Sequence, residues 1–78
     1  MSEQHLTFGE KACGVDFNPD GDLNVQQIKR QFADIVDHLD RIRAENALNH
    51  DMARMLSIAI TEAQTAQMWA VKAVTWRH

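Results

Sequence analysis

The stretch that decides the fold is residues 52–76, MARMLSIAITEAQTAQMWAVKAVTW. It contains no proline or glycine and only three charged residues, Arg54, Glu62 and Lys72. Its apolar residues occupy nearly every side of a helix, and a helix that is apolar all round must be covered on several faces. The rest of the chain offers at most one other long helix. We therefore expect the protein to assemble with copies of itself.

Two stripes run along this helix. The first is made of alanines at alternating spacings of four and three, which lets another backbone approach closely: Ala59, Ala63, Ala66, Ala70 and Ala73. The second carries guanidinium, hydroxyl and amide groups: Arg54, Ser57, Thr61, Gln64 and Thr75. The polar stripe is either a solvated face, with hydroxyls bonding back to the preceding turn, or a binding surface.

The chain ahead of this helix divides in two. All three glycines and the only proline precede residue 22, so residues 1–22 are predicted to be irregular. Residues 23–45 are predicted to form an amphipathic helix, capped by Asp22 or Asn24, with one buried seam. The seam has apolar residues at spacings of three and four: Val25, Ile28, Phe32, Ile35, Leu39 and Ile42. The opposite face is expected to meet solvent: Asp34, Asp37, Asp40 and Arg41.

A short polar break, Asn46 to His50, follows this helix, and Asn49 or Asp51 is placed to cap the next one. A connection this short predicts an antiparallel helical hairpin. We therefore predict an all-α fold, with residues 1–78 forming one domain. Its parts are an N-terminal loop segment over 1–22 and helices over 23–45 and 51–76, assembled as a compact homo-oligomer.

Size and charge narrow the possible functions. At 78 residues a single core is marginal without disulfides, metal or oligomerisation. The single Cys13 closes no intrachain disulfide, which suggests a reducing, cytosolic setting and a buried, idle thiol. The net charge of −3 argues against binding a nucleic acid polymer. The polar groups in residues 52–76 are too many for a membrane span, but a small anion held by a few Arg or Lys residues stays open.

Residues 16–27, DFNPDGDLNVQQ, partly resemble a calcium-binding loop. Oxygen-bearing residues fill the first, third and fifth positions and a glycine the sixth: Asp16, Asn18, Asp20 and Gly21. However, Gln27 at the twelfth position cannot give a bidentate carboxylate, and Gly9 and Gly14 are expected to prevent the preceding helix. An Asx-type turn with a helix cap is the simpler interpretation.

No catalytic or metal-binding constellation stands out. The four histidines are scattered, with no pair at ligand spacing: His5, His38, His50 and His78. There is no nucleophile with a paired base, glycine-rich phosphate loop or close carboxylate pair. The sequence therefore predicts a protein that is not an enzyme and carries no metal or cofactor.

The basic residues are suggestive by position. Lys29 and Arg30 lie early in the first long helix, and Arg54 lies in the first turn of the second, where the helix dipole disfavours a cation. A bound phosphate would compensate and would also meet free backbone N–H groups. Phe17, just ahead of the first long helix, is placed to stack on a base. The alternative is surface ion pairs, such as Arg54 with Asp51, and a Phe17 that packs the loop onto the core.

Residues 53–76, ARMLSIAITEAQTAQMWAVKAVTW, resemble the C-terminal helix of the phage anti-CBASS cyclic-nucleotide sponges, a hairpin-domain family that includes a Thoeris anti-defence sponge. The shared pattern is an arginine, a serine and a threonine, then a Met-Trp pair and small residues: Arg54, Ser57, Thr61, Met68, Trp69, Ala70 and Ala73. Residues 17–39 also resemble the family's loop and first helix. Together these segments cover most of the chain.

The resemblance implies a hexamer that binds cyclic oligonucleotides between protomers without cleaving them. A cyclic dinucleotide would lie near Phe17, Asn18, Pro19 and Lys29, with Arg30 as a rival to Lys29 for the phosphate. A cyclic trinucleotide would be held by three residues of the last helix: Arg54, Ser57 and Thr61. Relatives often carry tyrosine at the aromatic position, so Phe17 would stack without donating a hydrogen bond.

The resemblance thus implies a phage counter-defence protein of the host cytoplasm. It would sequester cyclic dinucleotide and trinucleotide immune signals and so block activation of CBASS effectors. Two alternatives stay open. One is a sponge for a cyclic ADP-ribose derivative, the Thoeris signal. The other is a structural helical oligomer or adaptor that uses Trp69 or Trp76 as its contact.

Overall fold

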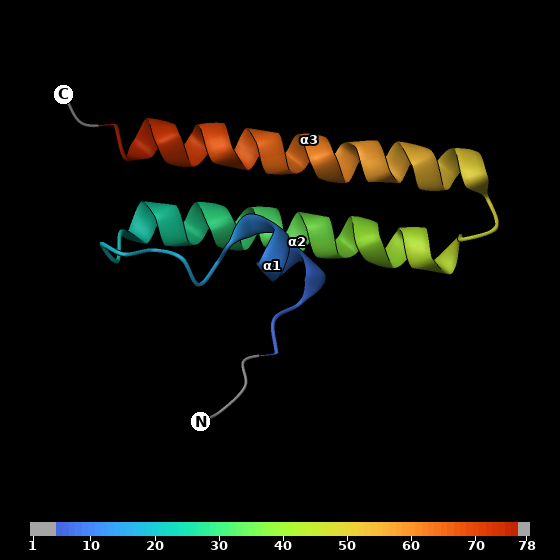
Figure 1. The fold of residues 1–78 in the computed structure, drawn as a ribbon, viewed down its shortest axis with the longest axis horizontal. Coiled ribbons are helices and arrows are strands. Elements are labelled where there is room, and N and C mark those ends of the chain that lie inside the picture. Colours follow the sequence, from blue (N-terminus) through green and yellow to red (C-terminus); the bar gives the residue numbers. More distant parts are fainter. Residues whose placement is uncertain (1–4, 77–78) are drawn as a thin grey trace.

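The computed structural model describes residues 5–76, and α2 and α3 dominate this part of the chain. Helix α1 spans Phe8–Cys13, α2 spans Leu23–Glu45 and α3 spans His50–Val74. Helices α2 and α3 run side by side in opposite directions, and α1 packs mainly on α2 (Figure 1). The predicted all-α fold, built on a two-helix hairpin, is confirmed. No helix in residues 5–76 is long and apolar enough to cross a membrane.

Polar side chains fix where the two long helices begin. Asp22 Oδ1 accepts hydrogen bonds from the backbone N–H groups of Asn24 (2.8 Å) and Val25 (3.1 Å). Asn49 Oδ1 accepts from the backbone N–H of Met52 at 3.1 Å. These contacts satisfy N–H groups that have no partner inside a helix. Helix α3 ends at Val74, two residues before the predicted end at residue 76, because Thr75 leaves the helical conformation and caps it.

Helix α1 corrects the expectation that residues 1–22 are irregular. Thr7 Oγ1 accepts from the backbone N–H of Glu10 (3.0 Å), and Glu10 Oε1 accepts from the backbone N–H of Thr7 (2.8 Å). This reciprocal pair is a capping box. The glycines do not prevent the helix as expected. Gly9 lies within it, and Gly14 ends it with a left-handed conformation, φ 61°.

Gly9 also sets how closely α1 approaches α2. A Cβ atom at residue 9 would overlap the carbonyl oxygen of Ala33, so only glycine fits there. Asp37, which was expected to face solvent, instead accepts hydrogen bonds from Gly9 N (2.7 Å) and Thr7 Oγ1 (2.7 Å). These long-range bonds explain why α1 is helical, because a helix of one or two turns is not stable by itself in water.

The core differs from the predicted single seam. Ile35, placed in that seam, is 51% exposed, whereas Lys29, Ala33 and Val36 of α2 are buried. The buried stripe on α2 is displaced from the predicted seam because α1 covers a second side of α2. Few apolar side chains of residues 5–76 are buried: Cys13, Val25, Ala33, Val36 and Ile60.

The molecule is flat. Its Cα atoms extend only 13 Å along the shortest axis, and the radius of gyration is 14.1 Å. A compact chain of this length has a radius of gyration of about 11.5 Å. Its accessible surface is 5932 Å², against about 4,800 Å² for a folded monomer of this mass. One copy of the chain therefore leaves an unusually large surface uncovered.

One face of the hairpin is apolar and lies opposite α1. With 3.6 residues per turn, side chains seven positions apart share one side of a helix. Helix α2 presents isoleucines and α3 presents alanines at this spacing, and we name the surface the isoleucine–alanine face: Ile28, Ile35, Ile42, Ala59, Ala66 and Ala73. No described element covers this face, so it is available for another copy.

Candidate functional site

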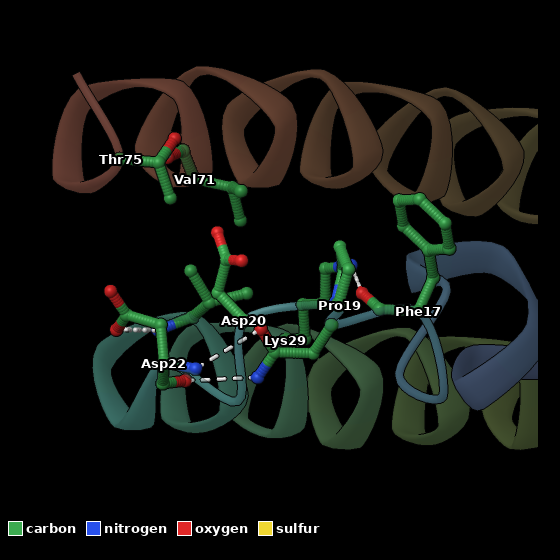
Figure 2. Close-up of a pocket in the computed structure, with 9 residues that line it drawn as sticks. Phe17, Pro19, Asp20, Asp22, Lys29, Val71 and Thr75 are labelled. Carbon is green, nitrogen blue, oxygen red and sulfur yellow. Dashed lines mark hydrogen bonds between the residues drawn. The ribbon is translucent and has the colours of Figure 1, made fainter. Parts of the chain in front are cut away.

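A hollow of about 250 Å³ lies between the loop after α1, the start of α2 and the end of α3 (Figure 2). We name it the loop hollow. Four of the predicted site residues line it together: Phe17, Asn18, Pro19 and Lys29. Sequence reasoning did not place its other lining residues in a nucleotide site: Asp20, Asp22, Val25, Val71 and Thr75.

Asn18 gives the loop its shape. Its Nδ2 donates to the backbone oxygen of Asp22 (2.9 Å), and its Oδ1 accepts from the backbone N–H of Asp22 (3.2 Å). Gly21 closes the same turn, with N–H donating to Asn18 O at 3.0 Å and a positive φ of 63°. An Asn side chain that bonds the nearby backbone in this way mimics a backbone turn and stabilises it. The side chain of Asn18 thus holds the loop that carries Phe17.

Lys29 is the buried cation of the loop hollow. The residue is only 7% exposed, and its Nζ donates to the carbonyl oxygens of Gly14 (3.0 Å) and Phe17. Nζ also lies 5.4 Å from the centroid of the Phe17 ring. An ammonium group has three N–H donors, and two of them meet these carbonyls. Lys29 therefore builds the loop, with one donor left for a ligand.

Phe17 stands out from the loop instead of packing it onto the core. The residue is 70% exposed, which excludes the interpretation that it anchors the loop. Lys29 places positive charge near its ring, and the rest of the ring meets solvent. An exposed aromatic ring on a loop closed by hydrogen bonds offers a stacking surface for a planar group.

Arg30, the rival of Lys29, is not part of the loop hollow. Its Nη1 pairs with Glu10 Oε2 at 2.6 Å, and its Nη2 pairs with Asp34 Oδ1 at 2.7 Å. Its guanidinium therefore joins α1 to α2. The bond from the backbone N–H of Thr7, followed by the bond from Arg30, lowers the pKa of Glu10 below its ordinary value of 4.5.

The predicted trinucleotide residues Arg54, Ser57 and Thr61 line a second, open hollow together with Ile58 and Glu62. We name it the α3 hollow. Within residues 5–76, Arg54 makes no ion pair, so the alternative pairing with Asp51 is absent and its guanidinium is free. Thr61 and Val71 are ten residues apart on α3, which at 1.5 Å per residue separates this hollow from the loop hollow by about 15 Å.

Arg43 of α2 is a neighbour of the α3 hollow that sequence reasoning missed. Its Nη1 donates to Ser57 Oγ at 2.9 Å, and its Nη2 pairs with Asp40 Oδ1 at 2.8 Å. Its guanidinium also lies 5.6 Å from the centroid of the Phe8 ring. Because Ser57 Oγ accepts from Arg43, the hydroxyl hydrogen is free to donate to a ligand.

Hairpin geometry is the signal that could have found Val71 and Thr75. In an antiparallel pair, the last turns of the second helix lie beside the first turns of the first. Residues near the end of α3 are thereby brought beside the loop and Lys29. Arg43 and Ser57 are likewise partners across the hairpin, near its closed end.

The remaining reactive group is Cys13, whose thiol is buried. Burial, together with the nearby charge of Asp37, raises the pKa of Cys13 above its ordinary value of 9.0. A raised pKa keeps the thiol protonated and weakly nucleophilic at neutral pH. No group of three or more His, Cys, Asp or Glu side chains within residues 5–76 is placed to hold a metal ion.

A family model described as the Acb2/Tad1 hairpin domain matches residues 11–75. The chain belongs to the Acb2/Tad1 hairpin family. This is the family of phage anti-CBASS and anti-Thoeris sponge proteins, so the predicted resemblance is confirmed. No curated protein and no solved structure matches the chain.

The Acb2/Tad1 match spans the end of α1, the loop and the whole hairpin. Both hollows therefore lie inside the matched segment. The family is known for non-catalytic binding proteins and is consistent with a role as a cyclic nucleotide sponge. In this member the aromatic group at the loop hollow is Phe17, and the cation beneath it is Lys29.

Proposed function

We propose that this protein is a phage counter-defence sponge of the host cytoplasm. It binds cyclic dinucleotide and cyclic trinucleotide immune signals without cleaving them, and the loss of free signal blocks activation of CBASS effectors. The observation that carries the proposal is the exposed Phe17 ring on a rigid loop, with the buried ammonium of Lys29 5.4 Å from its centroid. An aromatic face beside a cation suits a base linked to a phosphate.

The cyclic dinucleotide occupies the loop hollow. A base stacks on Phe17, the remaining N–H of Lys29 donates to a phosphate oxygen, and Asn18 and Pro19 form the wall. The volume of about 250 Å³ is below the ~300–1,000 Å³ typical of pockets that enclose small ligands. A second copy of the chain therefore covers the ligand.

The cyclic trinucleotide occupies the α3 hollow. Arg54 has no partner in the described chain, so its guanidinium is free to bind a phosphate through two parallel hydrogen bonds. Ser57 donates its hydroxyl hydrogen, and Thr61 adds a second hydroxyl. Glu62 lines the same hollow and opposes an anion, so several copies of Arg54 from neighbouring subunits are needed to make the site positive.

The assembly is a homohexamer in which subunits bury the isoleucine–alanine face. One copy exposes about 1,100 Å² more than a folded monomer of its mass, and a standard interface covers about 800 Å² per partner. The excess is thus enough for more than one standard interface. The short alanine side chains let helices of neighbouring copies pack closely.

Calorimetric titration with cyclic di-AMP and cyclic tri-AMP tests the two sites. The Phe17→Ala variant is expected to bind cyclic di-AMP about 5- to 160-fold more weakly, since one stacked base contributes about 1–3 kcal/mol. It should bind cyclic tri-AMP as the wild type does. The Arg54→Ala variant is expected to show the converse. Each variant is the matched control for the other, because both residues are exposed and neither supports the core.

Loss of both ligands in either variant would contradict two separate sites. Absence of heat and of thermal stabilisation with both ligands would contradict the sponge itself. Sequestration without cleavage requires that each ligand be recovered intact after the bound protein is denatured.

A cyclic ADP-ribose derivative is the second candidate ligand, supported by the Acb2/Tad1 match, which joins anti-CBASS and anti-Thoeris sponges in one family. Such a ligand also contains a base and phosphates, so the loop hollow would receive it. Competition against bound cyclic di-AMP decides the matter: displacement assigns both ligands to the loop hollow.

A further inference from the structure

A third hollow, of about 370 Å³, opens between the end of α1 and the last third of α3. We name it the Gln67 hollow. Its lining residues include two lysines and no carboxylate: Lys11, Ala12, Cys13, Gly14, Lys29, Gln67, Met68 and Val71. The loop hollow, by contrast, contains Asp20 and Asp22 beside its one lysine. Of the two, the Gln67 hollow is the more favourable for an anion.

Gln67 is the unusual residue of this hollow. It is only 5% exposed, yet its side-chain amide makes no hydrogen bond with any residue in 5–76. Every fully buried side-chain nitrogen or oxygen of the described residues has a hydrogen-bond partner. Because the Gln67 amide has none, its atoms are not fully buried and must reach open space. The amide therefore belongs to a nearly buried residue, yet it faces the hollow with its donors and acceptor unused by the described residues, so a ligand in the hollow could bond it in place of water.

The Gln67 hollow adjoins the loop hollow. Lys29 and Val71 line both of them. Along α3, Gln67, Val71 and Thr75 follow one another at spacings of four, so they form one stripe about 12 Å long. A ligand whose base lies on Phe17 therefore has Lys29 beside that base. The amide of Gln67 lies in the adjoining hollow, about two helical turns from Thr75.

We propose that the Gln67 hollow is a phosphate-binding subsite, in which the amide of Gln67 and the ammonium of Lys11 donate hydrogen bonds to phosphate oxygens. This inference rests on the proposed function for the ligand's identity, a cyclic dinucleotide whose base stacks on Phe17. The Gln67 NH₂ group supplies two donors, and Lys11 supplies charge at the mouth of the hollow. Lys29 then lies between the base and the phosphate.

Three variants test the subsite by titration calorimetry with cyclic di-AMP. Gln67→Met keeps the length of the side chain and removes its hydrogen bonds, and a weakening of about 10- to 100-fold is expected. Lys11→Gln is expected to weaken binding about 2- to 5-fold, because Lys11 is exposed, and to reduce its salt dependence. Lys72→Gln is the matched control and should bind as the wild type does, since Lys72 lies over Trp69, outside this hollow.

A structural role for Gln67 predicts a different result. If the amide supported the fold, Gln67→Met would lower the melting temperature of the free protein. The subsite predicts an unchanged or higher melting temperature, because the amide bonds no other described residue in the free protein, and an apolar side chain is favoured at a position this little exposed. Wild-type affinity in Gln67→Met, or an equal loss in Lys72→Gln, would overturn the subsite.

A second measurement does not depend on the proposed function. Pyrophosphate added to ¹⁵N-labelled protein is expected to shift the side-chain amide signals of Gln67, and not those of Gln26, which lies on the exposed side of α2. If pyrophosphate shifts these signals while cyclic dinucleotides do not bind, the subsite stands and the sponge proposal fails. If cyclic di-AMP binds and neither probe moves the Gln67 signals, the subsite fails and the sponge proposal stands.

Discussion

Lys29 joins three parts of the chain through one ammonium group. It comes from α2, donates to the carbonyls of Gly14 at the end of α1 and Phe17 in the loop, and lies beside the Phe17 ring. A charge this deeply buried is tolerated because carbonyl oxygens replace its water. Loss of ligand binding in a Lys29 variant would therefore report a changed loop as well as a missing phosphate contact.

Replacing Lys29 by methionine is expected to lower the free energy of unfolding by about 1–3 kcal/mol, because two carbonyl groups lose their charged donor. The loop over residues 14–22 should also become a site of rapid proteolysis. Urea unfolding and limited proteolysis measure the two effects. Arg30→Met is the control, since its exposed ion pairs contribute only about 0–1 kcal/mol. Equal destabilisation by the two substitutions would contradict the structural role of Lys29.

At the residue scale, the resemblance to sponge proteins grouped Phe17, Asn18, Pro19 and Lys29, and the structure places all four around one hollow. Their roles as ligand-binding residues stay predictions. The sequence did not reveal that Lys29 is buried, because its burial depends on a helix that the sequence pattern did not predict. The same reason explains why Gln67 was overlooked: an amide becomes notable only once α1 covers it.

Helix α1 is held by polar contacts at its first turn and by Cys13, which is buried in the core at its last turn. Asp37 bonds Thr7 and Gly9, and Arg30 pairs with Glu10. The attachment of α1 therefore depends on charged carboxylates. A lowered pKa for Glu10 means that the folded state favours the ionised form.

The sign of the pH effect follows from this lowered pKa. The stabilisation due to Glu10 is complete above its ordinary pKa of 4.5 and is lost as the pH falls through the lower pKa of the folded state. Thermal unfolding followed between pH 7 and pH 2 should show the wild type more stable than Glu10→Gln at pH 7. The two melting temperatures should converge at the acidic end.

Glu62→Gln provides the control for this titration, because Glu62 is exposed on α3 and makes no ion pair within residues 5–76. Its melting temperature should follow that of the wild type across the range. Parallel curves for Glu10→Gln and the wild type down to pH 2 would show that Glu10 does not anchor α1.

At the element scale, hydrophobic periodicity was sufficient for the hairpin of α2 and α3. It failed for α1, since six residues with an internal glycine have too little local preference for a helix. The decisive partner, Asp37, lies 28 residues after Gly9. A contact at that separation leaves no local sequence pattern, and the shift of the buried stripe on α2 has the same cause.

The whole molecule is a thin layer with apolar side chains on both long helices. Ile35 of α2 is half exposed, and so are several large side chains of α3 and Trp76 just after it: Met55, Ile58, Met68 and Trp69 on the helix itself. A monomer rarely leaves so much apolar surface open to water. The expectation that a single copy is incomplete came from the apolar character of residues 52–76, and self-association remains a proposal.

Dilution tests self-association directly. If folding is coupled to assembly, the melting temperature should fall as the protein is diluted. Sedimentation velocity should show one large species at high concentration. Ile35→Glu, which places a charge on the isoleucine–alanine face, should reduce the sedimentation coefficient to that of a smaller species.

Arg41→Glu is the matched control, because it introduces the same side chain on a different, exposed side of α2. Its sedimentation coefficient should equal that of the wild type. A folded wild-type monomer at low micromolar concentration would contradict both the assembly and the shared ligand sites.

Helix α1 has one further consequence for the molecule as a whole. At its start, the Phe8 ring lies against Arg43, which bonds Ser57 in the α3 hollow. At its end, Gly14 accepts a hydrogen bond from Lys29 in the loop hollow. Helix α1, with its C-cap Gly14, thus touches the supports of two cavities that lie apart on α3. Any event that detaches this segment, whether cleavage by a host protease or a bound partner, would disturb both cavities together; under the proposed function it would release both cyclic nucleotides in one step.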